Sequence, residues 1–159
     1  MAPNRPIPAL GPGSLIFTIA GTPPAGNAAA LDISCQVTAC KITFDSDKED
    51  DLPTLCGGVL AGEKNYTSKL EASAAQDLEK NGLIDWTWKN AGKQARFEFI
   101  PLTGPGAATV TGTVTIDPVE LGGDVKKRNV SDFEFDTIGV PVFTPDTTAD
   151  TTEYPPLTP

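Results

Sequence analysis

The chain has 159 residues, of which 39% are hydrophobic and 21% are charged, so it is long enough for one folded domain with its own core. A net charge of −9 and the absence of histidine argue against a nucleic-acid-binding protein, a hydrolase with a histidine base and a histidine-ligated zinc protein. They do not argue against a surface past which DNA moves without binding.

Proline is concentrated at the two ends of the chain. Nine of the 15 prolines lie in residues 1–13 and 141–159. We therefore predict an N-terminal arm over residues 1–13, a folded domain over residues 14–142 and a Pro/Thr-rich C-terminal tail over residues 143–159. The tail does not carry enough apolar surface to order by itself.

The three cysteines, Cys35, Cys40 and Cys56, have no histidine and no second cysteine pair beside them. A C-x4-C spacing alone is not a zinc pattern, so we expect buried small side chains, with a redox pair or a metal site as the alternative. No apolar segment follows a basic start, and no apolar run approaches the length that spans a membrane. We expect a soluble protein without a membrane anchor, made in a reducing cytoplasm.

The first predicted elements are strands. Residues 14–20 form a short apolar run between turns rich in glycine and proline, which predicts a buried strand. Residues 31–44 predict a longer strand. Its apolar residues change parity near residues 40–41, and a change of parity turns the side chains to the other face, so we predict a β-bulge there.

Residues 45–51 are a cluster of charges, which we interpret as a solvated loop or an arm between strands. Their spacing resembles the start of a calcium-binding loop. Position six is Asp50 instead of glycine, however, and position twelve is Cys56 instead of glutamate. Calcium binding is therefore not predicted, and residues 47–62 are expected to form a compact linker.

Two predictions compete in the segment that follows. Residues 65–74 fit a strand, because Tyr66, Leu70 and Ala72 share one parity. Residues 67–80 are rich in helix-forming residues and fit a helix equally well. The sequence leaves both open.

Residues 76–90 are the best helix prediction, because apolar side chains recur three and four residues apart. A strand over residues 84–88 is the alternative, since the apolar residues there also alternate. We expect both tryptophans, Trp86 and Trp88, to anchor the core.

The clearest strand pattern lies over residues 107–117, preceded by a second alternating run over residues 93–102 and a turn between them. Valine and isoleucine occupy even positions and threonine occupies odd positions. We expect the even positions to pack in the core (Val110, Val114 and Ile116) and the odd positions to face water (Thr109, Thr111, Thr113 and Thr115).

Residues 126–128 form the one concentrated basic patch of the sequence. Three residues are too few to predict nucleic-acid binding, and a contact with an acidic loop of another subunit fits them at least as well. Residues 129–140 predict the last strand, with a bulge or bend near residues 136–137 where the apolar parity shifts again.

The predicted fold is mainly β, with about five to seven strands in a β-sandwich or barrel and one flanking helix at about residues 76–90. No nucleophile elbow, phosphate loop, dinucleotide fingerprint or metal-ligand spacing is present. We predict no enzymatic activity, no catalytic, cofactor-binding or metal-binding residues and no cofactor. A pair of carboxylates could serve a glycosidase, but no aromatic-lined cleft accompanies them.

A series of short segments runs in a fixed order from Ile42 to Pro141. In chain order they are Ile42-Thr-Phe-Asp-Ser-Asp, Tyr66-Thr-Ser-Lys-Leu-Glu, Ala75-Gln-Asp-Leu, Gly82-Leu-Ile-Asp, Asn90-Ala-Gly, Phe97-Glu-Phe-Ile-Pro101, Val110-Thr-Gly-Thr-Val, Ser131-Asp-Phe-Glu-Phe-Asp and Gly139-Val-Pro141. This series resembles the major tail (tail tube) proteins of long, non-contractile-tailed, siphovirus-type phages, particularly those that infect actinobacteria.

The resemblance implies a β-sandwich with a flanking helix that forms hexameric rings. The rings stack into a hollow tube, joined by an extended loop and the terminal arms. It also implies assembly in the host cytoplasm around a tape-measure protein, with baseplate and tail-terminator proteins as further partners, and passage of DNA through the lumen without specific binding. We expect the −9 charge to line that lumen. Whether residues 45–62 form the inter-ring arm stays open, because we expect a compact linker there.

Three other classes remain as alternatives. The first is an extracellular β-sandwich binding or adhesin module, which would need export. The second is a phage head decoration or head–tail connector protein, and the third is a small acid-rich hydrolase. Stacking of rings into long tubes separates the tail protein from all three.

Overall fold

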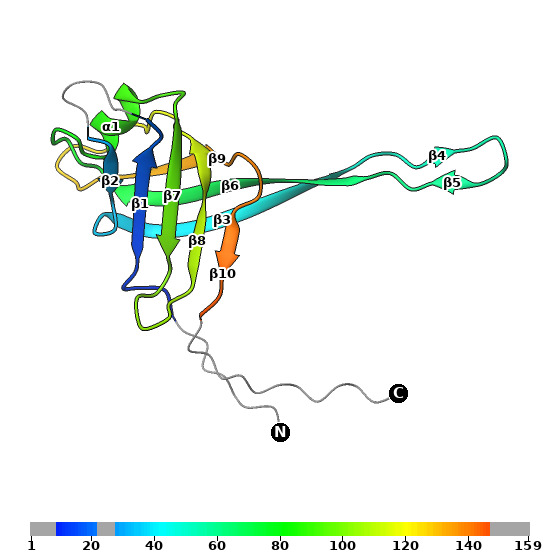
Figure 1. Cartoon of the computed structure of the whole chain (residues 1–159). Coiled ribbons are helices and arrows are strands. Elements are labelled where there is room, and N and C mark those ends of the chain that lie inside the picture. Colours follow the sequence, from blue (N-terminus) through cyan, green and yellow to red (C-terminus); the bar gives the residue numbers. More distant parts are fainter. Residues whose placement is uncertain (1–8, 22–27, 147–159) are drawn as a thin grey trace.

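The computed structural model describes residues 9–21 and 28–146, and in this part the chain is mainly β, as predicted (Figure 1). Strands pair antiparallel throughout, in a five-stranded sheet with the order β10-β8-β7-β1-β2, a three-stranded sheet with the order β3-β6-β9 and a two-stranded sheet of β4 and β5. The elements are β1 Ser14–Ile19, β2 Ala30–Asp32, β3 Val37–Lys48, β4 Leu52–Pro53, β5 Val59–Leu60, β6 Lys64–Ala75, α1 Leu83–Lys89, β7 Gln94–Ile100, β8 Thr109–Thr115, β9 Val130–Asp136 and β10 Val142–Thr144.

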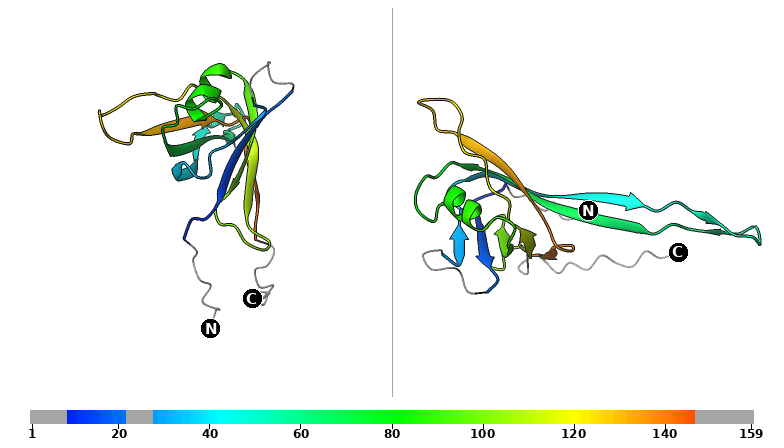
Figure 2. Two further views of the ribbon diagram at one scale, coloured as in Figure 1. Left: turned by 90° about the vertical axis from the view of Figure 1, so that its left-hand side faces the viewer. Right: turned by 90° about the horizontal axis from the view of Figure 1, so that it is seen from above.

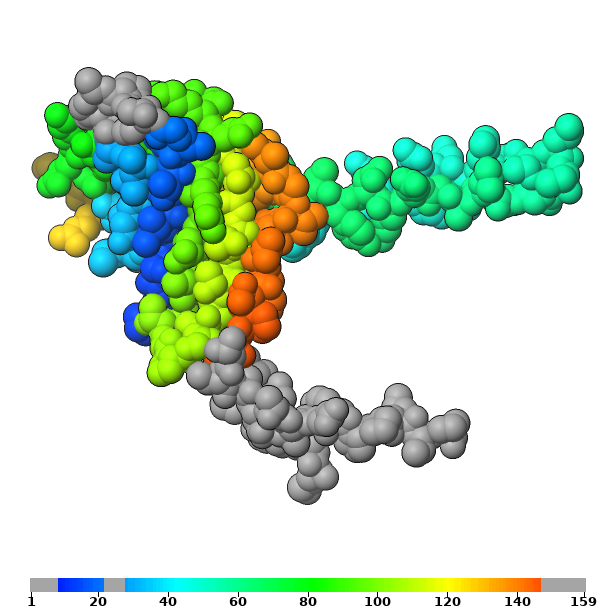
Figure 3. All heavy atoms as spheres, viewed as in Figure 1, coloured from blue at the N-terminus to red at the C-terminus, as the bar shows by residue number. Residues whose placement is uncertain are grey.

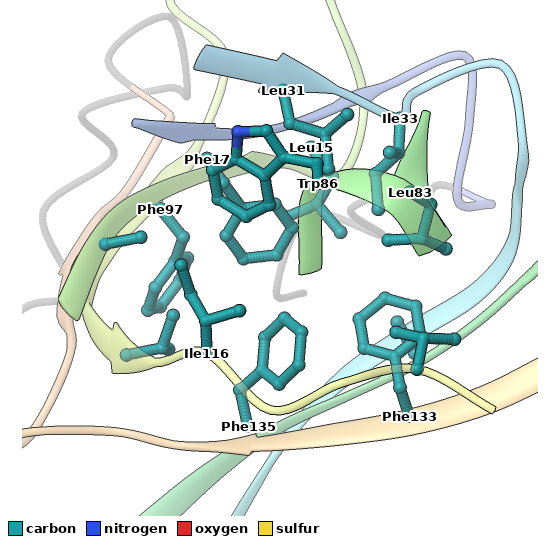
Figure 4. Close-up of a cluster of buried hydrophobic side chains, with 14 of the residues drawn as sticks. Leu15, Phe17, Leu31, Ile33, Leu83, Trp86, Phe97, Ile116, Phe133 and Phe135 are labelled. Atoms are coloured by element: carbon teal, nitrogen blue, oxygen red, sulfur yellow. The ribbon is translucent and has the colours of Figure 1, made fainter. Parts of the chain in front are cut away.

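The five-stranded and three-stranded sheets face each other, with their strands crossing steeply, and enclose one core (Figures 1 and 2). An aromatic cluster joins the layers, because the Phe17 ring lies 5.6 Å from the Phe135 ring across the sandwich and 6.2 Å from the Trp86 ring on the helix (Figure 4). Helix α1 buries Leu83 and Ile84 beside Trp86 and covers one end of this core. Burial of these side chains is the main stabilising term of the fold.

The two sheets also meet at a seam. Strand β9 ends at Asp136, and Thr137 then forms an isolated bridge with Val114 of β8. The amide of Ile138 donates to the carbonyl of Thr113 at 2.8 Å. The bend predicted near residues 136–137 is thus confirmed as the place where the chain passes from one sheet to the other.

The even positions in and just after β8 face the core, as predicted. Val114 and Ile116 are fully buried, and Val110 packs against the core. Position 112, which also faces inward, is glycine because a Cβ there would lie 2.8 Å from the Phe97 ring. The threonines of this strand are half-buried instead of freely hydrated.

The predicted helix over residues 76–90 is too long. Helix α1 begins at Leu83, and residues 76–82 form a turn in which Asn81 has a φ of 60° and Gly82 is the N-cap. The alternative helix over residues 67–80 is wrong: β6 runs to Ala75 and buries its even positions, so tertiary packing overrides the helix propensity. The alternative strand over residues 84–88 is wrong as well.

The long strand predicted over residues 31–44 is two strands. Strand β2 ends at Asp32, whose carboxylate accepts a hydrogen bond from the Ser34 amide at 3.0 Å, and a turn follows before β3 begins at Val37. The irregularity in register lies between Val37 and Ala39, not at residues 40–41. A short side chain that binds the backbone two residues on favours a turn over a continuing strand.

The expectation for the tryptophans is half right. Trp86 is fully buried, whereas Trp88 is 54% exposed and keeps only its indole N–H engaged, donating to the Val119 carbonyl at 2.7 Å. Most of the predicted N-terminal arm and C-terminal tail lies outside the described residues. The described part of the N-terminal segment is joined to the turn after β7, where the amide of Gly11 donates to the carbonyl of Pro101 at 2.8 Å.

Candidate assembly surfaces

In residues 9–21 and 28–146, no group of three or more histidine, cysteine, aspartate or glutamate side chains is placed to hold a metal. Nor does this part of the chain contain a helix long and apolar enough to cross a membrane. A cleft of about 280 Å³ opens between Leu10, Cys40 and Phe99. Burial raises the pKa of the Cys40 thiol in this cleft to about 12, which disfavours the nucleophilic thiolate.

The most prominent surface is a long hairpin, residues 45–67, called the arm here (Figures 1 and 3). Strands β3 and β6 continue out of the body and pair as far as Lys48 and Lys64, and β4 and β5 pair beyond them. From Asp45 to Leu55 at the tip, ten residues of extended chain span roughly 33 Å. The compact linker predicted for residues 47–62 is therefore wrong, and of the loop or arm predicted at residues 45–51 the structure has the arm.

Hydrogen bonds hold the arm in shape between the pairing of β3 with β6 and the pairing of β4 with β5. The amide of Glu49 donates to the carbonyl of Glu63 at 2.9 Å, and the amide of Gly62 donates to the carboxylate of Asp51 at 2.9 Å. The hydrogen bond from the Gly62 amide is the main cause of a pKa of Asp51 below its usual value, and the hydrogen bond from Lys48 is the second cause. A Cβ at Gly62 would lie 1.8 Å from the carbonyl oxygen of Glu49, so glycine is needed where the strands approach this closely.

The arm has no core of its own. Its apolar side chains are exposed, with Leu52 at 63%, Leu60 at 60% and Leu55 fully exposed at the tip. An isolated two-stranded hairpin is marginally stable in water, and clustered exposed apolar side chains mark a contact surface. The arm is also acidic, because six carboxylates and two lysines give it a net charge of −4.

Cys56 lies exposed beside the arm tip. The Thr54 hydroxyl, 3.2 Å from its sulfur, is the main cause of a pKa below the usual thiol value. Cys35 is exposed in the turn before β3, so the expectation that all three cysteines are buried fails for these two and holds in part for Cys40.

The outward face of the three-stranded sheet is polar and acidic. Lys41, Glu71 and Glu134 form one row across its strands, and Thr43, Lys69 and Asp136 form the next. Lys41 pairs with Glu71 at 3.1 Å, but the lysines are outnumbered. With the outward residues of the arm included, this face carries six carboxylates and two lysines (Asp45, Asp47, Glu71, Asp132, Glu134, Asp136; Lys41, Lys69).

The outward face of the five-stranded sheet differs in charge. Arg96 lies between Thr18 and Thr113, and Glu98 lies in the next row between Ile16 and Thr111. One positive and one negative side chain leave this face neutral on β7, and hydroxyl groups dominate on β8. Asp32 of β2, beside Ile16, adds a second carboxylate to this face. The predicted threonine face therefore belongs to the less acidic side of the sandwich.

A third surface is the loop before β9, residues 120–129, called the basic loop here. Two pairs of hydrogen bonds fix it: Gln76 bonds the amide and carbonyl of Gly122, and Asn129 bonds the amide and carbonyl of Asp124. Lys127 pairs with Asp124 at 3.0 Å. Within the described ranges, neither Lys126 nor Arg128 has a carboxylate at ion-pair distance.

No protein-family model matches the chain, and no curated protein matches it. The chain is similar in structure to solved tail and virion proteins, of which two follow. A chain in the tail of an empty gene transfer agent particle with C6 symmetry aligns with a TM-score of 0.52 and 17% identity, covering 82% of this chain and 95% of that one. A chain in the virion of a native gene transfer agent particle aligns with a TM-score of 0.52, 15% identity and the same coverage. At these identities the likeness concerns the fold, and this chain has the fold of a subunit from that C6-symmetric tail.

Proposed function

We propose that this protein is the structural subunit of a siphovirus-type phage tail tube. Its subunits form hexameric rings that stack into a hollow tube, through which DNA reaches the host. The observation that carries this proposal is the arm: a long hairpin with exposed apolar side chains, on a sandwich whose fold is that of a subunit in a C6-symmetric tail. Such a hairpin gains stability only against another chain.

The subunit has open sheet edges that a ring could cover. In the described part of the chain, β2 and β10 are the outer strands of one sheet and β3 and β9 of the other. Unpaired edges favour pairing with further chains, and a closed ring of subunits removes them. The role is structural, without catalysis, and its place is the virion.

The acidic face of the three-stranded sheet is the better candidate for the lumen wall. DNA carries one negative charge per phosphate, so an excess of carboxylates opposes adhesion during passage. The less acidic, threonine-rich face of the other sheet then belongs to the outside of the tube. The tape-measure protein occupies the lumen until DNA passes, and baseplate and tail-terminator proteins cover the two ends of the tube.

Electron microscopy of the purified protein tests the proposal. We expect rings with sixfold symmetry, and tubes made of stacked rings at high protein concentration. A protein that stays monomeric at every concentration contradicts the proposal and favours a binding or adhesin module. Rings that occur only on capsids favour a head decoration or connector protein.

A charge variant tests the assignment of the lumen. In tubes of Glu134→Lys we expect DNA to be retained at low salt and released at high salt, because the wall becomes less negative. Glu98→Lys makes the same charge change on the less acidic sheet and is the matched control. Equal retention of DNA by both variants would contradict the assignment of the lumen to the three-stranded sheet.

A further inference from the structure

We propose that the arm of one subunit docks on the basic loop, residues 120–129, of a subunit in the next ring. The inference rests on the proposed function, because it assumes rings stacked head to tail. It assigns both sides of the contact between rings to residues of this chain.

The strand pairing places the two surfaces at opposite ends of one sheet. Strand β6 leaves the arm near Thr67 and ends at Ala75. Ala75 pairs with Val130, the first residue of β9, and the basic loop comes directly before it. Seen from above, the arm extends from one end of the molecule and the loop before β9 projects from the other (Figure 2). Rings stacked along the arm therefore bring each arm to the loop end of the next ring, as a head-to-tail contact that repeats without closing.

The charges of the two surfaces are complementary. The arm has a net charge of −4, and on it no described cation lies at ion-pair distance from Glu49 or Asp50. The basic loop has three cations against two carboxylates, and of these cations Lys127 has an ion pair with a described residue whereas Lys126 and Arg128 do not. Opposite charges on two surfaces guide their approach and select their register.

Both surfaces also expose apolar side chains beside their charges. Val125 in the basic loop is 86% exposed and Leu121 is 50% exposed, and Leu52 and Leu60 on the arm are exposed to a similar degree. An apolar centre with a charged rim is the usual composition of a specific protein interface. Association along the arm would remove these side chains from water.

The basic loop is held in one shape before any partner arrives. The side-chain amide of Gln76 donates to the Gly122 carbonyl at 2.7 Å, and that of Asn129 donates to the Asp124 carbonyl at 3.1 Å. Lys126 has a φ of 64°, a left-handed conformation that an unconstrained lysine rarely adopts. A loop fixed in this way loses little conformational freedom on binding, which favours a docking surface.

Charge reversal tests the contact. We expect Lys126→Glu/Arg128→Glu to form rings but to stack at least about tenfold more slowly at low salt, because the attraction becomes a repulsion. The arm variant Glu49→Lys/Asp50→Lys should show the same loss. A chain that carries all four substitutions restores opposite charges, so we expect it to form tubes again but not to stack on wild-type rings. Lys93→Glu/Arg96→Glu changes the net charge equally, away from the arm and the basic loop, and should stack like the wild type.

The outcomes separate this inference from the proposed function. Wild-type tubes together with unimpaired stacking of both reversed variants overturn the docking of arm on loop and leave the tube function intact. Failure of the fourfold variant to stack, with its rings preserved, also overturns it. A wild-type protein that forms neither rings nor tubes overturns the proposed function and, with it, the docking. Recovery of tubes in the fourfold variant supports the contact directly.

Discussion

The body and the arm are built from the same two strands, but different partners stabilise them. In the body, β3 and β6 lie over a core in which Phe17, Trp86 and Phe135 are fully buried. In the arm, the ends of these strands have water on both faces, and Leu52 of β4 and Leu60 of β5 beyond them stay mostly exposed. The body therefore has a core within its own chain, whereas the apolar surface of the arm is suited to another chain. Substitutions should accordingly act on folding in the body and on assembly in the arm.

The largest effect is expected from a charge in the core. Phe135→Asp should prevent folding, because Phe135 is fully buried and an unpaired carboxylate there costs several kcal/mol. Phe133→Asp should do the same, since Phe133 is 8% exposed. Circular dichroism would report the loss of the native fold. Glu134→Ser, on the outward face between them, should fold normally; a folded Phe135→Asp variant would show that β9 is not part of the core.

The next effect compares the two tryptophans of α1. Trp86→Ala should lower the free energy of unfolding by about 3–5 kcal/mol, because it leaves a cavity and frees the Ala28 carbonyl, to which its indole donates at 3.0 Å. Trp88→Ala should cost about 1 kcal/mol, mainly one hydrogen bond. Urea denaturation measures both. Equal losses would mean that Trp88 is as deeply packed as Trp86.

A smaller effect on folding, with a large effect on assembly, is expected in the arm. Leu52→Ser/Leu60→Ser should change the free energy of unfolding of the body by no more than about 0.5 kcal/mol, since both side chains are exposed. Tube formation should be lost. Thermal denaturation and electron microscopy on the same sample separate the two effects, and a variant that unfolds would show that the arm supports the body.

The smallest perturbation is chemical labelling, which leaves the fold intact. At neutral pH a thiol reagent should modify Cys56 quickly and Cys40 slowly, because the thiolate is the reactive form. Burial raises the pKa of Cys40 to about 12, so it stays a thiol until strongly alkaline pH, whereas the pKa of Cys56 is lowered chiefly by the Thr54 hydroxyl. Labelling at Cys56 should therefore level off at a lower pH. Mass spectrometry of peptides measures both rates. Faster modification of Cys40 than of Cys56 would contradict the burial of Cys40 in the body.

The sequence predicted the elements whose side chains are buried within this chain. The alternation of β7, β8 and β9 is visible because each has one face in the core. The outer part of β3 escaped prediction because Asp45 and Lys48 lie on opposite faces and both are exposed, so no periodicity marks a strand there. The helix was predicted to start too early because Asp77 and Glu79 suit a helix start, whereas Asn81 and Gly82 form a turn before α1 begins at Leu83.

The sequence predicted the charge of the candidate surfaces but not where they lie in the fold. The acidic residues 45–51 and the basic residues 126–128 stand out in the sequence. Their placement at opposite ends of one sheet depends on the register in which Ala75 pairs with Val130. Such a register between residues far apart in the chain is not encoded in either segment alone.

The unbroken passage of β3 and β6 from body to arm has a mechanical consequence. A pull on the arm acts along the strands, and β6 is joined to β9 by seven consecutive residue pairs, from Lys69 with Asp136 to Ala75 with Val130. Tension in this direction loads all the rungs at once in shear, instead of peeling them apart one after another. The resistance of the hairpin to a pull along its axis is thus shared by all seven residue pairs between β6 and β9.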